Sequence, residues 1–555
     1  MVLTLGRQRA FLLLVTAIFA IASFLFSVTY TIKHNLSLVK RFASLTKWSD
    51  EDNDNDDLEN MAIGALLLNT TGCQVPNFDP FDPTTRDQTK LLPEQSCPEA
   101  GGLTYLDDGG FVRINKTVSR VFYTDVIAYC ECQEIVRPSS KLYEDFQFQY
   151  TDAVRFNERV KFESEFVRVA CFGANKTRLY VGFHAQVRQK ITNIEKQRSF
   201  KNSLASTKKE VNQPNVILIG FDSTSRLNSI RQLKTTRKYL FESLRAVELK
   251  AYNRVGMNTF PNMIPLLTGQ YVNDFGADRF RSHIDDLPLI WKRYSRRGYR
   301  TLFAEDGHPI MGFFTYRKPG FNQTPTDYYL RPLNLAMKSE YNVRYNEPLC
   351  IGAMPENRFV LNWLYDVIAT PDPRPLFAVA FFWRRIHEDM NELSRLDRMF
   401  AAFFRRLADE RRLENTVLVV FSDHGVRFGQ QKRTPIGVAE VNLPMSLIRV
   451  PPTFCAKNPS RLKNLKRNAG ARLTTPFDVH ETLVHILNLC KDHEDDDERG
   501  NSRYRPEPGK RRLGVSLFEQ ISSRRSCENL DIAAPYCGCR VNQVNTTSAQ
   551  RDVVL

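Results

Sequence analysis

Four continuous apolar runs constrain the fold of this chain more than any other feature of its sequence. They lie at 215–221, 301–304, 376–383 and 416–421. Such runs are typical of strands that are buried on both faces of a sheet. Helical patterns lie between them, at 231–244, 261–268, 287–296, 358–368 and 394–413. The alternation predicts an α/β fold with a mostly parallel sheet flanked by helices.

The remaining sequence suggests further units around this core, since 555 residues are too many for one compact core. Short β-type stretches at 110–114, 119–127 and 178–184 predict a β-rich N-terminal region without long helices. We expect these segments: a cytoplasmic tail at 1–9, a transmembrane signal anchor at 10–32, a stalk at 33–69, a β-rich domain at 70–210, an α/β core at 211–490, and a charged insertion with a Cys-containing tail at 491–555.

The N-terminal segment 10–32 contains no charged residue. About 20 apolar residues span the hydrocarbon layer of a bilayer. The run is longer than the apolar part of a cleavable signal peptide and lacks a clear cleavage site, so we expect an uncleaved anchor, with a cleaved signal peptide as the alternative. This predicts a single-pass type II membrane protein whose bulk is lumenal or extracellular, in the secretory pathway or at the cell surface.

Two other features agree with export from the cytosol. Glycosylation sequons occur at Asn69, Asn115, Asn175, Asn322 and Asn545. The chain also has eleven cysteines, most of them in its first third and its tail. Their Cys-x-Cys pairs lack zinc-finger spacing, so they are interpreted as disulfides that staple the N-terminal region and the tail in an oxidising compartment.

The formal net charge of +15 allows two interpretations. The basic side chains are spread over a large surface, or they attract an anionic partner, here a phosphoester or a glycan-type substrate. Nucleic acid is not expected as a partner, because the sequence contains no recognisable binding module. The expected partners are therefore the membrane, through the N-terminal helix, and an anionic substrate. The sequence does not indicate an oligomeric state.

Two of the apolar runs end in residues that bind metals. Asp222 follows the first run, and Asp423 and His424 follow the last. Sites in parallel α/β sheets lie beyond the carboxyl ends of the strands. Each motif alone is also typical of a helix cap. Two such ends on one sheet favour one divalent cation, with zinc or manganese as the metals that accept these oxygen and nitrogen ligands.

A third motif surrounds Thr259, which stands two residues before Pro261. Proline suits the first turn of a helix, so Thr259 is expected just ahead of a helix N-terminus, where free N–H groups bind anions. A threonine hydroxyl that is bound to a divalent cation can ionise and attack phosphorus. Taken by itself, Thr259 is more simply a helix-capping residue.

These motifs together resemble a known superfamily. GFDSTSR at 220–226, NTFPNMIPLLTG at 258–269 and FSDHG at 421–425 occur in the order found in alkaline phosphatases and sulfatases. The closer similarity is to an uncharacterised branch, domain-of-unknown-function family 229. It rests on CQVPNFDPFDP from Cys73, on GF-x-x-TPTDYY at 320–329 and on TPFDVHETL at 475–483. The resemblance covers about 70–540 and implies an alkaline-phosphatase-like core.

The resemblance also implies roles for individual residues. Asp222, Asp423 and His424 would hold one divalent metal, with Thr259 as nucleophile and fourth ligand. His387 stands where relatives place a histidine near the substrate, so it would bind a second metal or protonate the leaving group. The neighbourhoods of the motifs imply substrate contacts at Asn262, Asp306, His308 and Arg427.

The sequence departs from the superfamily pattern in three places. Trp383 replaces the aspartate of two-metal members, so a second metal site is not completed. Thr259 cannot become formylglycine, which disfavours a sulfatase. The segment 438–444 lacks the acidic-acidic-Arg run of the branch. The sequence thus predicts a membrane-anchored, metal-dependent phosphoester hydrolase or transferase that uses Thr259; a non-catalytic glycosylated ectodomain that binds a partner is the alternative.

Overall fold

A computed structural model describes nine stretches of the chain: 66–124, 126–138, 144–190, 213–276, 278–307, 312–341, 350–429, 434–488 and 513–539. All of them belong to one compact unit that begins at Ala65. The expected anchor at 10–32, together with His308 and Asn545, lies outside the described residues. Within the described stretches no helix is both long and apolar enough to cross a membrane.

The centre of the fold is a seven-stranded sheet with the strand order β12-β20-β19-β11-β18-β14-β15. Four pairings are parallel, those of β11 with β18 and β19 and those of β14 with β18 and β15. The strands are β11 (Asn215–Phe221), β12 (Val247–Glu248), β14 (Arg300–Glu305), β15 (Tyr328–Tyr329), β18 (Leu376–Phe382), β19 (Thr416–Ser422) and β20 (Ser446–Arg449). The four strands predicted from apolar runs are its four central strands, which confirms the α/β class.

The sheet is mixed at one edge, because β20 is antiparallel to both β19 and β12. An antiparallel strand begins at the end of the sheet where its predecessor stops. The connection from β19 to β20 therefore stays at the carboxyl edge of β19. It contains α12 (Pro435–Asn442).

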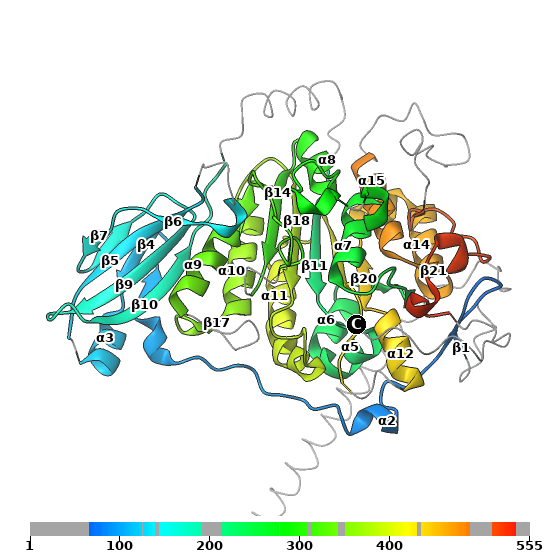
Figure 1. Cartoon of the computed structure of the whole chain (residues 1–555), viewed down its shortest axis with the longest axis horizontal. Helices are drawn as coiled ribbons and strands as arrows, with labels where there is room; N and C mark the ends of the chain where they lie inside the picture. The colour runs from blue at the N-terminus through cyan, green and yellow to red at the C-terminus, as the bar shows by residue number, and fades with distance from the viewer. Residues whose placement is uncertain are drawn as a thin grey trace, which may run out of the picture. The chain divides into compact units, whose positions relative to one another are not determined.

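Helices cover both faces of the sheet (Figure 1). In β11, Ile217 and Ile219 face one apolar cluster, whereas Val216 and Leu218 face another. Side chains alternate across a strand, so a strand without polar residues needs a cover on each side. The first cluster includes α6 (Lys234–Glu242), α9 (Arg331–Tyr341), α10 (Glu356–Ala369) and α11 (Asp397–Asp409). The second includes α7 (Thr259–Thr268), α8 (Ile290–Arg296), α14 (Pro459–Ala471) and α15 (Pro476–Asn488).

The stretch 231–244, which was predicted to be one helix, belongs to two helices in the structure. It contains the end of α5 (Arg226–Gln232) and the whole of α6, with Leu233 between them. The carboxylate of Asp397 accepts hydrogen bonds from the backbone N–H groups of Thr235 and Thr236. A side chain that belongs to another helix thus caps α6, which no local pattern indicates.

The N-terminal β-rich region consists of two antiparallel sheets, with orders β10-β9-β5-β6 (and β7 beside β5) and β3-β4-β8. Their strands are β3 (Thr104–Leu106), β4 (Phe111–Ile114), β5 (Ile127–Val136), β6 (Gln149–Tyr150), β7 (Val154–Phe156), β8 (Arg159–Lys161), β9 (Phe166–Gly173) and β10 (Arg178–Ala185). A disulfide between Cys130 and Cys171 joins β5 to β9.

One β prediction in this region was wrong. The stretch 119–127 was expected to be extended, but α3 (Lys116–Tyr123) occupies most of it. Asn115 caps this helix by accepting hydrogen bonds from the N–H groups of Thr117 and Val118, and Thr124 ends it in the left-handed conformation. The cap outweighs the β propensity of Val118, Val121 and Phe122.

The chain ahead of these sheets runs along the α/β core instead (Figure 1). β1 (Leu66–Asn69) and β2 (Gln74–Pro76) form a hairpin whose Cys73 is bonded to Cys539 in the C-terminal tail. A second disulfide joins Cys97 to Cys350. The expected disulfides are thereby present, and two of them bond the beginning of the described chain to its later parts.

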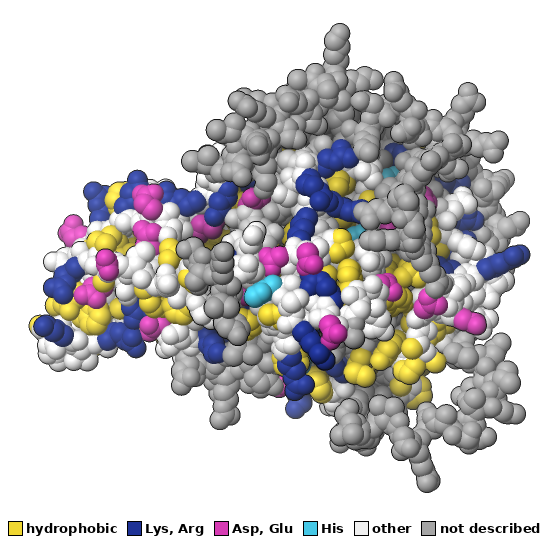
Figure 2. Space-filling view, turned by 45° about the horizontal axis from the view of Figure 1, so that its top comes forward, with side chains coloured by type: hydrophobic (Ala, Val, Ile, Leu, Met, Phe, Trp, Pro, Cys, Tyr) yellow, Lys and Arg dark blue, Asp and Glu magenta, His cyan; other side chains and the backbone are white. Residues whose placement is uncertain are grey.

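The charged side chains do not form a uniform basic surface. On the face shown in Figure 2, Lys and Arg side chains are interspersed with Asp and Glu side chains among the described atoms. Of the predicted glycosylation sites, Asn69 and Asn175 are exposed, and Asn115 and Asn322 are half-buried. Their glycosylation stays a prediction.

Two glycine substitutions test the packing of the central strand. A Cβ atom at Gly220 in β11 would lie 2.4 Å from the Cδ2 atom of Phe381 and 2.8 Å from the Cζ atom of Phe421. We expect Gly220→Ala to lower the free energy of unfolding by about 1–3 kcal/mol through overpacking. In α14, a Cβ at Gly470 would meet nothing within 4 Å. Gly470→Ala is therefore expected to raise the free energy of unfolding by about 0.5–1 kcal/mol. Denaturant midpoints measure both changes, and equal shifts would contradict the packing described.

Candidate metal centre

The register of the sheet brings the two aspartates together. β11 and β19 are parallel neighbours in which Phe221 lies opposite Ser422. Asp222 and Asp423 are the next residues on the two strands, so they leave the sheet side by side. His424 follows Asp423, and the three residues are at most 3% exposed. Their ligand atoms all lie within 4.8 Å of one another.

The loop backbone fixes the direction of the Asp423 carboxylate. Its Oδ1 atom accepts hydrogen bonds from the N–H of His424 at 2.8 Å and from the N–H of Ser223 at 3.1 Å. Ser223 has φ 53°, in the left-handed region. The N–H of Thr224 donates to the hydroxyl of Ser422 at 2.9 Å, which joins the two strand ends. One carboxylate oxygen is therefore held by the backbone while the other, Oδ2, remains available.

The tautomer of His424 is set in the same way. Its Nδ1 atom lies 2.9 Å from the carbonyl oxygen of Gly425 and donates a hydrogen bond to it, because a carbonyl oxygen can only accept. The Nε2 atom of a neutral imidazole then carries a lone pair. This atom lies 3.2 Å from Oδ2 of Asp423 and 4.0 Å from Oδ1 of Asp222. Neither Nε2 of His424 nor Oδ2 of Asp423 has a hydrogen-bond partner among the described residues.

Burial makes this arrangement unfavourable without a cation. Burial lowers the pKa of the His424 imidazole to about 4, so it is neutral at pH 7. Burial, followed by the negative charge of Asp423, raises the pKa of Asp222 well above its usual value. Two acceptor atoms thus face each other at 3.2 Å. A divalent cation between them would satisfy both, and the set of two carboxylates and one imidazole fits zinc or manganese.

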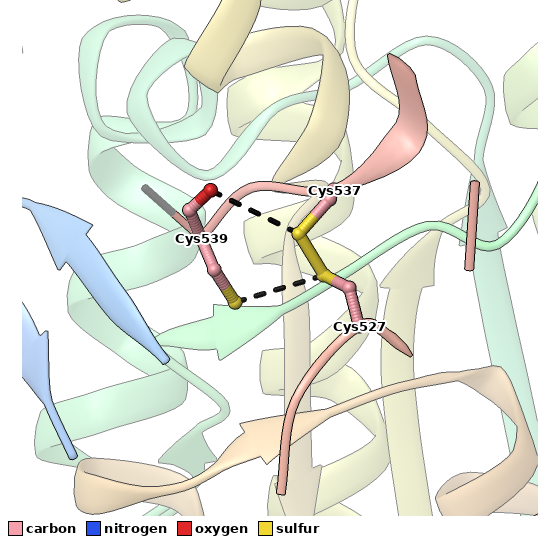
Figure 3. A group of neighbouring side chains, drawn as sticks. All are labelled: Cys527, Cys537 and Cys539. Atoms are coloured by element: carbon pink, nitrogen blue, oxygen red, sulfur yellow. Dashed lines mark hydrogen bonds between the residues drawn. A yellow bond between two sulfur atoms is a disulfide. The ribbon is translucent and has the colours of Figure 1, made fainter. Parts of the chain in front are cut away.

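A second cluster, of three cysteines, does not fit a metal. Cys527, Cys537 and Cys539 lie close together in the tail. Figure 3 shows a disulfide between Cys527 and Cys537, and Cys539 is bonded to Cys73. Disulfide sulfurs are not thiolates and do not bind zinc. The interpretation of these cysteines as disulfides is confirmed.

Thr259 is the first residue of α7 and is half-buried. The hydrogen bonds of Asn262 shape the loop in front of it. Its Oδ1 atom accepts from the N–H groups of Val255 and Gly256, and its Nδ2 atom donates to the carbonyl oxygens of Gly256 and Asn258. The amide of Asn262 has no capacity left for a substrate. Its geometry supports a positioning role, and a substrate contact would require breaking one of these bonds.

Arg254 lies on the loop before Thr259 and within electrostatic reach of the metal-type cluster, which is the group formed by Asp222, Asp423 and His424. The guanidinium group of Arg254 donates to the carbonyl oxygen of Met257 at 2.9 Å. After burial, which has the largest effect, the charge of Arg254 is among the influences that lower the pKa of His424. Arg254 is thus bonded within the loop before α7 and lies within electrostatic reach of His424.

His387 and Arg427 lie on loops that follow β18 and β19, and the structure brings them together. The ring of His387 is 5.6 Å from that of Phe428. Burial, followed by the charge of Arg427, lowers the pKa of His387. Arg427 also opposes the rise in the pKa of Asp222, so it lies within electrostatic reach of the cluster. Both side chains are half-buried.

Asp306 lies at the end of β14 and is buried. Its carboxylate accepts hydrogen bonds from the N–H groups of Trp383 and Arg384 and from the side-chain amide of Asn357. These bonds tie the end of β14 to the end of β18. The substrate contact that was expected for Asp306 stays a prediction, and His308 lies outside the described residues.

The sequence did not reveal a buried ion pair between Arg231 and Glu440. This pair supports the metal-type loops, which are the two loops that carry Asp222 and the Asp423–His424 pair. Glu440 of α12 accepts hydrogen bonds from both the hydroxyl of Ser225 and the guanidinium of Arg231. Ser225 caps α5 three residues after Asp222. The only signal in the sequence was an acidic residue within the otherwise uncharged helix 435–442. Glu440 thus fastens the Asp222 loop to the segment that follows the Asp423 loop.

The sheet and this cluster define the class: an α/β protein with a candidate divalent-metal centre at the carboxyl edge of its central sheet. The chain belongs to the DUF229 family, described as a protein of unknown function, whose family model matches residues 111–553. No curated protein matches the chain significantly.

Solved structures with some similarity have low TM-scores. The lipoteichoic acid synthase LtaP from Listeria monocytogenes is 13% identical with a TM-score of 0.36, over 52% of this chain and 78% of that one. Lipooligosaccharide phosphoethanolamine transferase A from Neisseria meningitidis is 13% identical with a TM-score of 0.36, over 51% of this chain and 56% of that one. Phosphonate monoester hydrolase of Agrobacterium radiobacter is 13% identical with a TM-score of 0.34, over 50% and 74%.

The buried Asp306 gives a pH dependence that can be measured. Burial, followed by the negative charge of Glu356, raises the pKa of Asp306 to about 7. An unfolded aspartate has a pKa of about 3.9. Between these values the folded protein holds a proton that the unfolded chain has lost, so stability falls as pH rises from about 4 to about 7. We expect Asp306→Asn to flatten this slope in denaturant titrations; an unchanged slope would contradict the assignment.

Proposed function

We propose that the chain is a membrane-anchored, metal-dependent hydrolase or transferase that acts on a phosphoester through Thr259. The observation that carries this proposal is the pair of buried acceptor atoms without a hydrogen-bond partner, Oδ2 of Asp423 and Nε2 of His424, 3.2 Å apart. Buried polar atoms of native proteins are rarely left unpaired. A cation supplies the missing partner for both.

Asp222, Asp423 and His424 would hold one divalent cation. When bound, the cation supplies positive charge that favours ionisation of a nearby hydroxyl and neutralises the oxygens of a phosphoester. Thr259 is proposed as the source of that hydroxyl, because it begins α7 and follows the loop on which Arg254 lies. The first N–H groups of α7 have no helical partners and favour an anion at this end.

The proposed reaction has two steps. In the first, a bond forms between Oγ of Thr259 and phosphorus, the bond from phosphorus to the leaving oxygen breaks, and the threonine proton passes to that oxygen through His387. In the second, the oxygen of water or of an acceptor hydroxyl bonds to phosphorus, the bond from phosphorus to the threonine oxygen breaks, and the proton of the attacking group passes to that threonine oxygen. A neutral histidine can relay protons in this way, and burial lowers the pKa of His387. Water as the acceptor gives a hydrolase, and an alcohol gives a transferase.

Arg427 is proposed to contact the anionic part of the substrate. It follows the Asp423–His424 pair on the same loop and lies within electrostatic reach of Asp222 and His387. A guanidinium group binds phosphate oxygens in a bidentate manner. With the expected anchor at 10–32, the substrate would be a lumenal or cell-surface phosphoester on a small molecule or glycan.

A non-catalytic binding scaffold is the second candidate, and Trp383 is the observation that favours it. It stands where the resemblance would place an aspartate of a second metal site, and it is buried. Its backbone N–H donates to Asp306. The position that relatives use for a second metal is thus filled by an indole. Metal content separates this scaffold from the enzyme.

Metal content is the first test of the proposal. We expect the full chain to bind one zinc or manganese ion. Loss of an outer-shell partner costs about 10–100-fold in metal affinity, so Asp423→Asn and His424→Gln are expected to weaken binding by at least about 100-fold. Asp397→Asn is the control, since this buried aspartate caps α6. A wild-type chain that takes up neither metal would support the scaffold.

Activity is the second test. The full chain is assayed against p-nitrophenyl phosphate, bis(p-nitrophenyl) phosphate and p-nitrophenyl sulfate. We expect turnover of a phosphoester, little turnover of the sulfate, and a loss of at least about a thousandfold in Thr259→Ala, as for other nucleophile deletions. Thr370→Ala, which removes a hydroxyl at the end of α10, should retain activity. Unchanged turnover in Thr259→Ala would rule out the nucleophile.

A further inference from the structure

The C-terminal tail contacts the site region through Asn442, the last residue of α12. The Nδ2 atom of this buried side chain donates to the carbonyl oxygens of Pro535 and Cys537, at 3.3 and 3.0 Å. Its Oδ1 atom accepts from Nε of Arg254 at 2.8 Å, and its backbone oxygen accepts from the N–H of Arg254 at 3.0 Å. One amide thus joins the tail to the loop before Thr259.

Asn253 makes a second connection between the tail and the same loop. Its Nδ2 atom donates to the carbonyl oxygen of Tyr536 at 2.8 Å, and its Oδ1 atom accepts from the N–H of Gly538. The guanidinium group of Arg254 lies 4.9 Å from the centre of the Tyr536 ring. Every residue from Pro535 to Gly538 therefore has a contact with Asn253, Arg254 or Asn442.

The segment 440–445, which contains Asn442, also touches both metal-type loops. The N–H of Gly425 donates to the carbonyl oxygen of Val441 at 3.0 Å, and the N–H of Ser422 donates to that of Met445 at 2.7 Å. On the other strand end, the N–H of Met445 donates to the carbonyl oxygen of Thr224 at 3.0 Å. The segment is therefore bonded to the residues beside Asp222 and to those beside Asp423 and His424.

Two disulfides hold the tail in this position. Cys527 is bonded to Cys537, and Cys539 is bonded to Cys73 in the β1–β2 hairpin (Figure 3 shows the three tail cysteines). Residues 535–538 of the tail make the contacts with Asn253 and Asn442, and this stretch includes Cys537 and ends next to Cys539 in the sequence. The two bonds thus limit how far residues 535–538 can move from the loops.

We propose that the C-terminal tail is a brace that fixes the loop before Thr259 relative to the loops carrying Asp222, Asp423 and His424, and that Asn442 is the positioning residue through which it acts. Its effect on catalysis rests on the proposed function. Its effect on the loops does not, because the hydrogen bonds exist whatever the site binds. Phosphoryl transfer depends on placing the nucleophile within tenths of an ångström, so a slack brace would lower the rate.

The chain offers a matched control for Asn442. Asn468 of α14 is also buried and also binds the tail. Its Nδ2 atom donates to the carbonyl oxygens of Leu517 and Glu519, and its Oδ1 atom accepts from the N–H of Ile521. Each of Asn468→Ala and Asn442→Ala therefore removes three side-chain hydrogen bonds, but those of Asn468 all go to the tail and none goes to the Arg254 loop. Asn442→Asp keeps the acceptor for Arg254 and loses both donors to the tail, which provides a milder variant.

Hydrogen exchange on the full chain tests the brace directly. We expect Asn442→Ala and Asn442→Asp to accelerate exchange about tenfold or more in peptides covering 253–262 and 422–426 together, because both loops lose a shared restraint. The Cys527→Ser/Cys537→Ser double variant should do the same. Asn468→Ala should accelerate exchange only around 513–521. Equal behaviour of the two asparagine variants, or protection unchanged at 253–262, would overturn the proposal.

A kinetic readout then tests the positioning role. If the brace sets the geometry of the reaction, Asn442→Asp lowers kcat for p-nitrophenyl phosphate about tenfold or more while Asn468→Ala leaves it unchanged. Equal kcat losses in both variants would reduce Asn442 to a purely structural residue. A wild-type chain without metal or turnover would refute the proposed function, while the exchange pattern would still decide whether the tail restrains the loops.

Discussion

The close approach of two buried acceptor atoms is the constraint on which the candidate site of this protein depends. Oδ2 of Asp423 and Nε2 of His424 lie 3.2 Å apart in a buried place. The backbone occupies the other oxygen of the carboxylate, and Gly425 occupies the other nitrogen of the ring. Neither side chain can turn away to relieve the repulsion without giving up those bonds. A fold keeps such an arrangement when a positive charge belongs between the atoms.

The topology of the sheet explains why so many chain segments meet at this point. Parallel strands place the ends of β11, β18 and β19 on one edge, and the antiparallel return of β20 keeps the connection after β19 on that edge as well. Asp222, His387 and Asp423 thus come from three different strand ends. A uniformly parallel sheet would have carried the segment 434–445, with Glu440 and Asn442, away to the opposite edge.

The sequence was informative where a pattern is local and uninformative where a partner is distant. The uncharged run at 215–221 predicted the bounds of β11, and its continuation predicted that Asp222 would meet Asp423 and His424. The helix at 116–123 is an exception to this rule, because the cap of Asn115 that begins it is local and the β propensity of the stretch still led to the wrong prediction. The pair of Arg231 with Glu440 and the bonds of Asn442 to the tail join residues about 90–210 positions apart. No periodicity records such contacts, because each depends on the finished fold.

The bond between Cys73 and Cys539 spans 466 positions of the chain. During synthesis the first of these cysteines emerges long before the second, so for most of translation its proper partner does not yet exist. The hairpin that carries Cys73 can be sealed only after the last stretch of tail has been made and has found Asn253 and Asn442. The strands of the central sheet are all made before this point, whereas the hydrogen bonds of the tail to Asn253 and Asn442 require residues 535–538. The bond between Cys73 and Cys539 therefore distinguishes chains whose synthesis has passed Cys539 from shorter ones.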